Sequence, residues 1–158
     1  MGLKKRTMEF SDSMYAALTI PVKVRVASQI AATDFEIVVF HAPPFVSDAS
    51  NGNDALEYGR TTLYTVKNVR FIPDTTQAGA TATKSTYTIN RYDSAGANGA
   101  VVATFDGITG ADLTALTAKD FGAITSATLK SGETLTLKKV HTSTGTATPA
   151  GLLILDVV

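Results

Sequence analysis

The chain has 158 residues, 44% of them hydrophobic and 18% charged, with 14 basic and 14 acidic side chains and no cysteine. This length corresponds to one domain that is able to bury a core, and the low charge is atypical of disordered chains. The absence of cysteine excludes disulfides, thiol catalysis and cysteine-ligated zinc, and the balanced charge gives no overall basic field for nucleic acid.

Residues 1–14 differ from the rest of the chain because they show no strand alternation. A basic cluster at residues 4–6 is followed by acidic and polar residues, not by the roughly 7–15 apolar residues of a signal peptide. We therefore expect no targeting signal, an N-terminal arm over residues 1–14 and a single β-sandwich domain over residues 15–158. The longest apolar runs are far shorter than the ~20 residues of a membrane-spanning helix, which predicts no membrane partner.

Three strands are predicted in the first half of the chain. Pro21–Val26 places valines on one face and basic side chains on the other, and its proline suits a strand start or a sheet edge. Asp34–Phe40 is apolar on both faces after its acidic residues, as in a central strand covered on both sides. The third strand, Thr61–Ile72, follows an irregular stretch, His41–Arg60, and a loop of this length usually has a function.

The remaining elements follow at near-regular spacing. Two β-hairpins are predicted, each with turn-forming residues between its strands. The first hairpin pairs Thr86–Tyr92 with Ala100–Phe105, and the second pairs Ile124–Leu129 with Thr134–Val140. Between the hairpins, Asp112–Ala118 predicts a short helical turn with Asp112 as its N-cap. The final strand, Leu152–Val158, is almost wholly apolar and is therefore expected to be buried.

The pattern as a whole is typical of an all-β fold. About eight short strands with turn signals between them, and no alternation of helices with strands, predict a single-domain β-sandwich. Short hairpins mixed with a few long connections favour a jelly-roll-like topology. The high frequency of threonine agrees, because β-branched side chains suit the pleated surface of a sheet.

The two histidines, His41 and His141, give little support for a metal site. Zinc and iron sites usually combine two or three histidines with a carboxylate. His141 with Glu133 suggests a cupin-like site, but the dense histidine and glutamate spacing of that fold is missing. We predict no metal and no cofactor, and we expect both histidines to be polar residues at strand ends.

Other catalytic patterns are equally weak. Ser131 lies in a predicted turn and not in a G-x-S-x-G elbow, and no phosphate-binding loop is present. Asp34 and Glu36 are expected to face the same side of one strand, whereas a glycosidase needs two opposed carboxyl groups. Asp48–Asp54 and Asp106–Asp112 do not match an EF-hand, although a weak calcium site stays open. The sequence thus predicts no enzyme, no small-molecule substrate and no nucleic-acid partner.

Several segments of the last third of the chain are rich in threonine and glycine and are expected to form a series of hairpins and loops. They are Phe105–Phe121 (FDGITGADLTALTAKDF), Ala123–Leu129 (AITSATL), Ser131–Leu137 (SGETLTL), Gly145–Pro149 (GTATP) and the terminal apolar strand. Together they resemble bacteriophage virion proteins of the capsid decoration (cement) and head-fibre-like kind. The resemblance implies a structural virion protein, a capsid decoration protein that binds the major capsid protein and stabilises the phage head. It also implies a homotrimer located on the capsid surface after synthesis in the host cytoplasm.

The N-terminal arm is the predicted contact with the capsid, together with the His41–Arg60 loop. The candidate arm residues are Lys4, Lys5, Arg6, Met8 and Phe10.

One alternative function is that of another structural phage component, such as a tail or neck protein. A second alternative is a carbohydrate-binding β-sandwich, in which exposed aromatic rings stack on sugars. The rings available for that role are Tyr58, Tyr64, Tyr87 and Tyr92. A metal-dependent β-barrel enzyme is the third.

Overall fold

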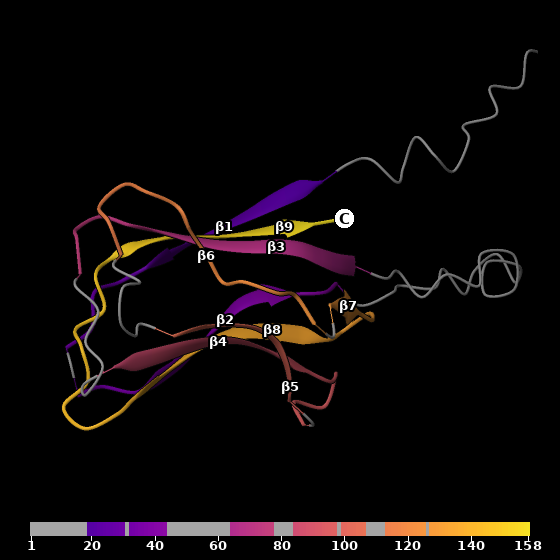
Figure 1. The fold of residues 1–158 in the computed structure, drawn as a ribbon. Coiled ribbons are helices and arrows are strands. Elements are labelled where there is room, and N and C mark those ends of the chain that lie inside the picture. Colours follow the sequence, from indigo (N-terminus) through magenta and orange to yellow (C-terminus); the bar gives the residue numbers. More distant parts are fainter. Residues whose placement is uncertain are drawn as a thin grey trace, which may run out of the picture.

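The computed structural model describes residues 19–30, 32–43, 64–77, 84–97, 99–106, 113–125 and 127–158. These residues form nine strands and no helix (Figure 1). The strands are β1 (Ile20–Val26), β2 (Phe35–His41), β3 (Tyr64–Pro73), β4 (Ser85–Tyr92), β5 (Ala100–Asp106), β6 (Lys119–Asp120), β7 (Thr128–Leu129), β8 (Thr134–His141) and β9 (Gly151–Val157). The described part of the chain accordingly offers no helix that could cross a membrane.

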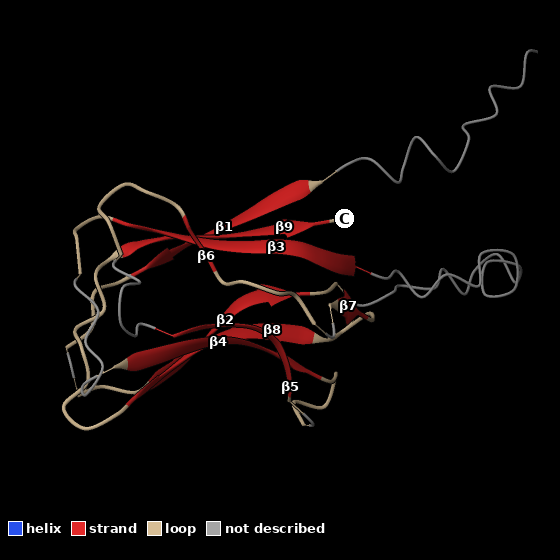
Figure 2. Cartoon of the chain, in the orientation of Figure 1, coloured by secondary structure: helices blue, strands red, loops and turns tan. Residues whose placement is uncertain are grey.

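The strands form two antiparallel sheets that pack face to face (Figure 2). The first sheet has the order β1-β9-β3, and the short strands β6 and β7 both pair with the outer edge of β3. The second sheet has the order β2-β8-β4-β5. The predicted all-β sandwich is confirmed.

The connectivity is that of a jelly roll. The chain pairs β1 with β9, β2 with β8, β3 with β6 and β7, and β4 with β5. These pairs are nested inside one another and fall alternately in the first and the second sheet, as in a long hairpin rolled into two layers. Rolling the chain in this way places the loops at two ends of the sandwich, one of which holds the C-terminus (Figure 1).

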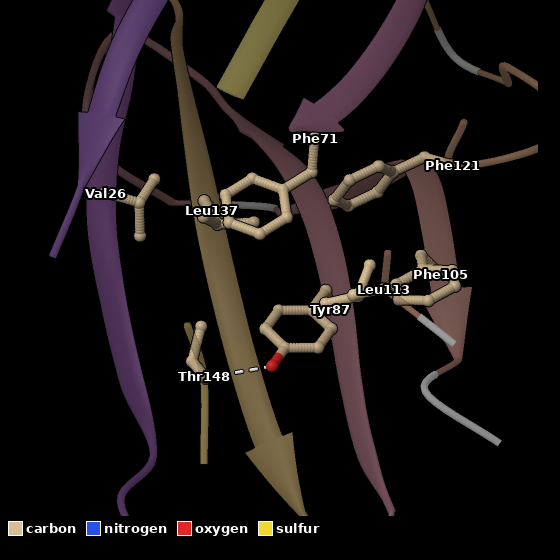
Figure 3. Close-up of a pocket in the computed structure, with 8 residues that line it drawn as sticks. All are labelled: Val26, Phe71, Tyr87, Phe105, Leu113, Phe121, Leu137 and Thr148. Carbon is tan, nitrogen blue, oxygen red and sulfur yellow. Dashed lines mark hydrogen bonds between the residues drawn. The ribbon is translucent and has the colours of Figure 1, made fainter. Parts of the chain in front are cut away.

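The core lies between the sheets and follows from the alternation of the strands. Inward positions of β8 and β9 are leucines, as at Leu135, Leu137, Leu153 and Leu155, all of which are buried. An aromatic layer completes the filling: the ring centroid of Phe105 lies 5.9 Å from those of both Tyr87 and Phe121 (Figure 3). The cavity left among these rings has a volume of only about 10 Å³, so side chains fill this part of the interior.

Strand β9 is the predicted terminal strand, and most of its side chains are buried, as expected. It lies between β1 and β3 and hydrogen-bonds to both, in registers such as Leu155 opposite Val22 and Val69. Strand β1 lies at the sheet edge, as the proline at position 21 indicated. The first predicted hairpin, now β4 and β5, also forms.

Strand β2 is an edge strand, so the prediction of a central strand covered on both sides is wrong. It pairs with β8 alone among the described strands, and the Val38 side chain is 63% exposed. The register shifts between Val38 and Phe40, and this bulge changes the face to which successive residues point. A run of apolar residues therefore arises from an edge irregularity and not from burial on both faces.

The predicted helical turn at residues 112–118 is replaced by irregular structure. Asp112 lies outside the described residues, whereas Leu113 forms an isolated bridge with Gln77 and is buried. Leu116 is 78% exposed and has a φ of 58°, which is incompatible with a right-handed helix. The two leucines therefore do not share a helical face.

The second predicted hairpin is also wrong in its pairing. The turn at residues 130–133 forms, but it connects β7 in the first sheet to β8 in the second. Ala42 donates its backbone N–H to the carbonyl of Glu133, and Gly132 donates to the carbonyl of Ala42. The turn therefore binds the end of β2, and the chain crosses between the layers because Leu129 and Leu135 fill the core from opposite sheets.

One charged side chain enters the interior near the end of β8. Lys139 has no exposed surface, and its Nζ donates to the backbone carbonyl of Ile30 over 3.2 Å. Burial lowers the pKa of Lys139, although the negative charge of Asp34 acts in the opposite direction. The lysine thus anchors the segment that follows β1 to the second sheet.

A buried hydrogen bond ties the second sheet to the loop before β9. The hydroxyl of Tyr87 lies 2.8 Å from Oγ1 of Thr148 (Figure 3).

Tyr87→Phe leaves the threonine hydroxyl without this partner, so we expect the free energy of unfolding to fall by about 1–3 kcal/mol in urea denaturation. Adding Thr148→Val should recover part of that loss, because both polar groups are then removed. A double variant whose loss equals the sum of the two single losses would contradict a direct interaction.

Candidate functional site

The outer face of the second sheet carries the most distinctive surface side chains of the described chain. One row of residues crosses all four strands: Val38 on β2 lies opposite Thr136 on β8, which lies opposite Asn90 on β4, which lies opposite Val101 on β5. The two valines are 63% and 50% exposed. The row therefore has a polar centre and an exposed apolar side chain at each end.

Glu36 on β2 is the centre of a hydrogen-bond cluster on this face. Its Oε1 accepts from the hydroxyl of Thr136 over 2.6 Å and from the hydroxyl of Tyr92 over 2.7 Å. Nδ2 of Asn90 lies 3.5 Å from the same oxygen, and Nζ of Lys138 lies 3.8 Å from Oε2. Pairing of the three strands brings these side chains together from sequence positions about a hundred residues apart.

These contacts alter the acidity of two groups. Partial burial by itself raises the pKa of Glu36, but the hydrogen bonds from Thr136, Tyr92 and Asn90 outweigh it and hold this pKa below its ordinary value. The hydrogen bond to Glu36 raises the pKa of the Tyr92 hydroxyl. At neutral pH the cluster therefore contains a carboxylate and a neutral phenol.

The cluster forms one side of a shallow depression of about 270 Å³ that is open to solvent. Its lining residues are Glu36, Val38, Tyr92, Gly96, Thr134 and Thr136. Gly99 helps to position the tyrosine, because a Cβ at residue 99 would lie only 2.9 Å from a ring carbon of Tyr92. The ring is thus packed against the backbone at the β4–β5 turn.

Charged side chains on this face form ion pairs. Lys138 faces Glu36, and Lys84 lies 3.6 Å from Asp106, whose carboxylate also accepts from the Thr86 hydroxyl. The other outward positions of β4 and β8 include the threonines at 86, 88 and 134 and Val140, which is 43% exposed. Such a face is suited to contact with another surface, because paired charges and hydroxyls cost less to bury than isolated charges.

The two histidines lie at opposite ends of the β2–β8 pair. Nδ1 of His141 is 2.6 Å from a carboxylate oxygen of Asp34, and Nδ1 of His41 is 2.9 Å from the hydroxyl of Thr134. Glu133 lies at the end of β8 opposite to His141, so the two do not form the cupin-like pair considered from the sequence. In the described residues no group of three or more histidine and acidic side chains is close enough to hold a metal ion.

The carboxylates of Asp34 and Glu36 have separate partners. Asp34 precedes β2 and accepts hydrogen bonds from the backbone and the ring of His141, and these bonds lower its pKa. Glu36 belongs to the outer-face cluster described above. Ser131 has a turn role, since its hydroxyl donates to the carbonyl of Pro43 over 3.0 Å.

The tyrosines do not form an aromatic platform in the described structure. Tyr87 is buried in the core, and Tyr64 is partly buried with its ring against Phe40 at 5.6 Å between centroids. Tyr92 is held by Glu36, and Tyr58 lies outside the described residues. Burial excludes Tyr87 from stacking on a sugar, and the sugar-binding alternative stays a prediction for the other three tyrosines.

The predicted capsid-contact residues of the arm all lie outside the described residues, as do most of the His41–Arg60 loop and the possible calcium ligands at 48–54 and 107–112. The outer-face cluster was not predicted from the sequence, where Glu36 was paired only with Asp34. Asn90, Tyr92 and Thr136 alternate outward on two other predicted strands and were a usable signal. These residues can be connected with Glu36 only when the order of the strands is known.

Comparison of the chain with protein-family models, with curated proteins and with solved structures finds no match.

Glu36→Gln tests the electrostatic role of the cluster. Because the pKa of Glu36 is lowered on folding, its carboxylate stabilises the fold above the ordinary glutamate pKa, and this contribution is lost as the pH falls through the lowered value. We expect the variant to be less stable than the parent at pH 7 by up to about 1 kcal/mol, because the side chain is partly exposed. The difference should shrink towards zero near pH 2, as measured by urea denaturation at both pH values.

Asp120→Asn, which neutralises an exposed carboxylate on β6, is the control and should change stability at pH 7 by less than about 0.5 kcal/mol. An effect of Glu36→Gln that is equally large at both pH values would show that the charge of Glu36 is not responsible.

Proposed function

We propose that the chain is a structural virion protein that decorates a bacteriophage capsid, binds the major capsid protein and stabilises the head. The observation that carries this proposal is the outer face of the second sheet, where paired charges and hydroxyls separate exposed valines at opposite strands. A surface of this kind suits adhesion to neighbouring subunits, and jelly rolls recur among viral capsid domains. The resemblance of the last third of the chain to decoration proteins gives the proposal its specific form.

The proposed assembly is a homotrimer in which two different edges of the second sheet meet. A cyclic trimer needs a heterologous interface, in which one patch contacts a different patch on the next copy. Val38 on β2 and Val101 on β5 provide two such patches, because they lie at opposite ends of one row across the sheet. We propose that the Val38 end of one copy packs against the Val101 end of the next.

Sedimentation velocity of Val38→Lys and Val101→Lys tests this arrangement. Each substitution introduces a charge into every interface of the ring, so each variant alone should convert a trimer into monomers. Both positions are exposed on strands at the sheet edge, and we therefore expect the fold to survive, as judged by the thermal midpoint. Ala118→Lys, a substitution at an exposed residue away from this face, should remain trimeric. A parent chain that sediments as a monomer would contradict the proposed trimer.

Binding to the capsid is tested with heads of the encoding phage from which this chain is absent. We expect the purified chain to co-sediment with such heads and to raise the temperature at which they rupture. Deletion of residues 1–14 should abolish co-sedimentation without changing the thermal midpoint of the chain, because these residues precede the β-sandwich. Lack of binding by the full chain would overturn the decoration role, whereas undiminished binding by the shortened chain would overturn only the role of the arm.

A further inference from the structure

A second open surface lies at the end of the sandwich opposite to the C-terminus (Figure 1), far from the β4–β5 turn. It is a groove of about 570 Å³ formed by three segments, 28–30, 75–77 and 145–149. This volume falls within the range of about 300–1,000 Å³ that is usual for ligand sites. The groove is distinct from the shallow depression beside Glu36, which lies on the outer face of the second sheet.

The three segments are fixed by hydrogen bonds that a ligand does not have to provide. Gln29 and Thr148 exchange two backbone hydrogen bonds of 2.9 Å, and Gln77 exchanges bonds of 2.8 and 3.0 Å with Leu113. The hydroxyl of Ser85 donates to the carbonyl of Thr146, and Thr148 binds the buried hydroxyl of Tyr87. A site held in this way is preorganised, so little conformational entropy is lost when a ligand binds.

The described residues that line the groove carry no charge. No ionisable side chain occurs among them, whereas hydroxyl and amide side chains occur on every segment, including Ser28, Thr75 and Gln77. The exposed Ile30 side chain adds an apolar surface at the rim. Hydroxyls and amides that both donate and accept, next to an apolar surface, match a ligand with hydroxyl groups on its edges and C–H groups on its faces.

We propose that this groove is a binding site for a neutral glycan. The proposal goes beyond the decoration role and does not depend on it. An extended peptide is the less suitable ligand, because the backbone groups of Gln29, Gln77 and Thr148 that would pair with a peptide strand are already bound within the protein. An anionic glycan is disfavoured because the part of the lining that the structure describes has no basic side chain.

The test is a glycan array that contains neutral and anionic glycans, probed with the full chain, followed by calorimetric titration of the strongest neutral glycan. We expect binding to neutral glycans, with amide chemical shifts that change at residues 28–30, 75–77 and 145–148. Ala147→Arg places a long side chain on an exposed residue in the groove and should weaken binding at least tenfold. Ala118→Arg, the same substitution at an exposed residue outside the groove, should leave the affinity unchanged.

Gln77→Leu separates a binding role from a structural one. It replaces the amide of a lining residue with an apolar group of similar volume, so we expect the thermal midpoint to stay constant while glycan affinity falls at least tenfold. A lower thermal midpoint for this variant would show that the amide serves the fold. Absence of binding to every neutral glycan on the array, binding to anionic glycans alone, or equal affinities of the Ala147→Arg variant and the parent would overturn the proposal. None of these results would affect binding to phage heads.

Discussion

The apolar strand at the C-terminus is the element on which the rest of the structure depends. Strand β9 is hydrogen-bonded along both edges, to β1 and to β3, and its inward side chains fill the core from the first sheet. It lies between β1, the first strand of the chain, and β3, and the pairs β2–β8 and β4–β5 nest inside the β1–β9 pair. This nesting is the jelly roll, and it groups the loops at two ends of the sandwich.

Two surfaces result from this architecture, and they differ in chemistry for a physical reason. The outer face of the second sheet is formed by regular strands, so its side chains repeat in rows and place valines at opposite ends of a polar centre around Thr136 and Asn90. The groove near Gln29, Gln77 and Thr148 is formed by irregular segments, whose backbone groups are satisfied by isolated bridges. A flat face of the first kind suits contact with another protein, whereas a concave, preorganised site of the second kind suits a small ligand.

Much of the fold was predictable because the local alternation of apolar and polar residues matches the burial of the side chains in the structure. The alternation in residues 21–26, the turn-rich segment 93–99 and the apolar end of the chain each predicted the correct element. Predictions were wrong where one local signal was compatible with two arrangements. The turn at residues 130–133 reverses the chain equally well within a sheet or between sheets, and the spacing of Leu113 and Leu116 suits a helix only if the backbone stays in the helical region. The apolar run in β2 was ambiguous for a similar reason, because a bulge at an edge also places apolar residues on both faces.

The sequence by itself determined the fold class, the approximate strands and the apolar positions, because these depend on residue type and spacing along the chain. Tertiary structure decided which strands pair, and therefore which side chains meet. The cluster around Glu36 joins residues from three strands, and the groove joins three segments that are distant along the chain. No local pattern encodes these contacts, because they depend on the order and register of the strands. Order and register are set by the packing of the whole core.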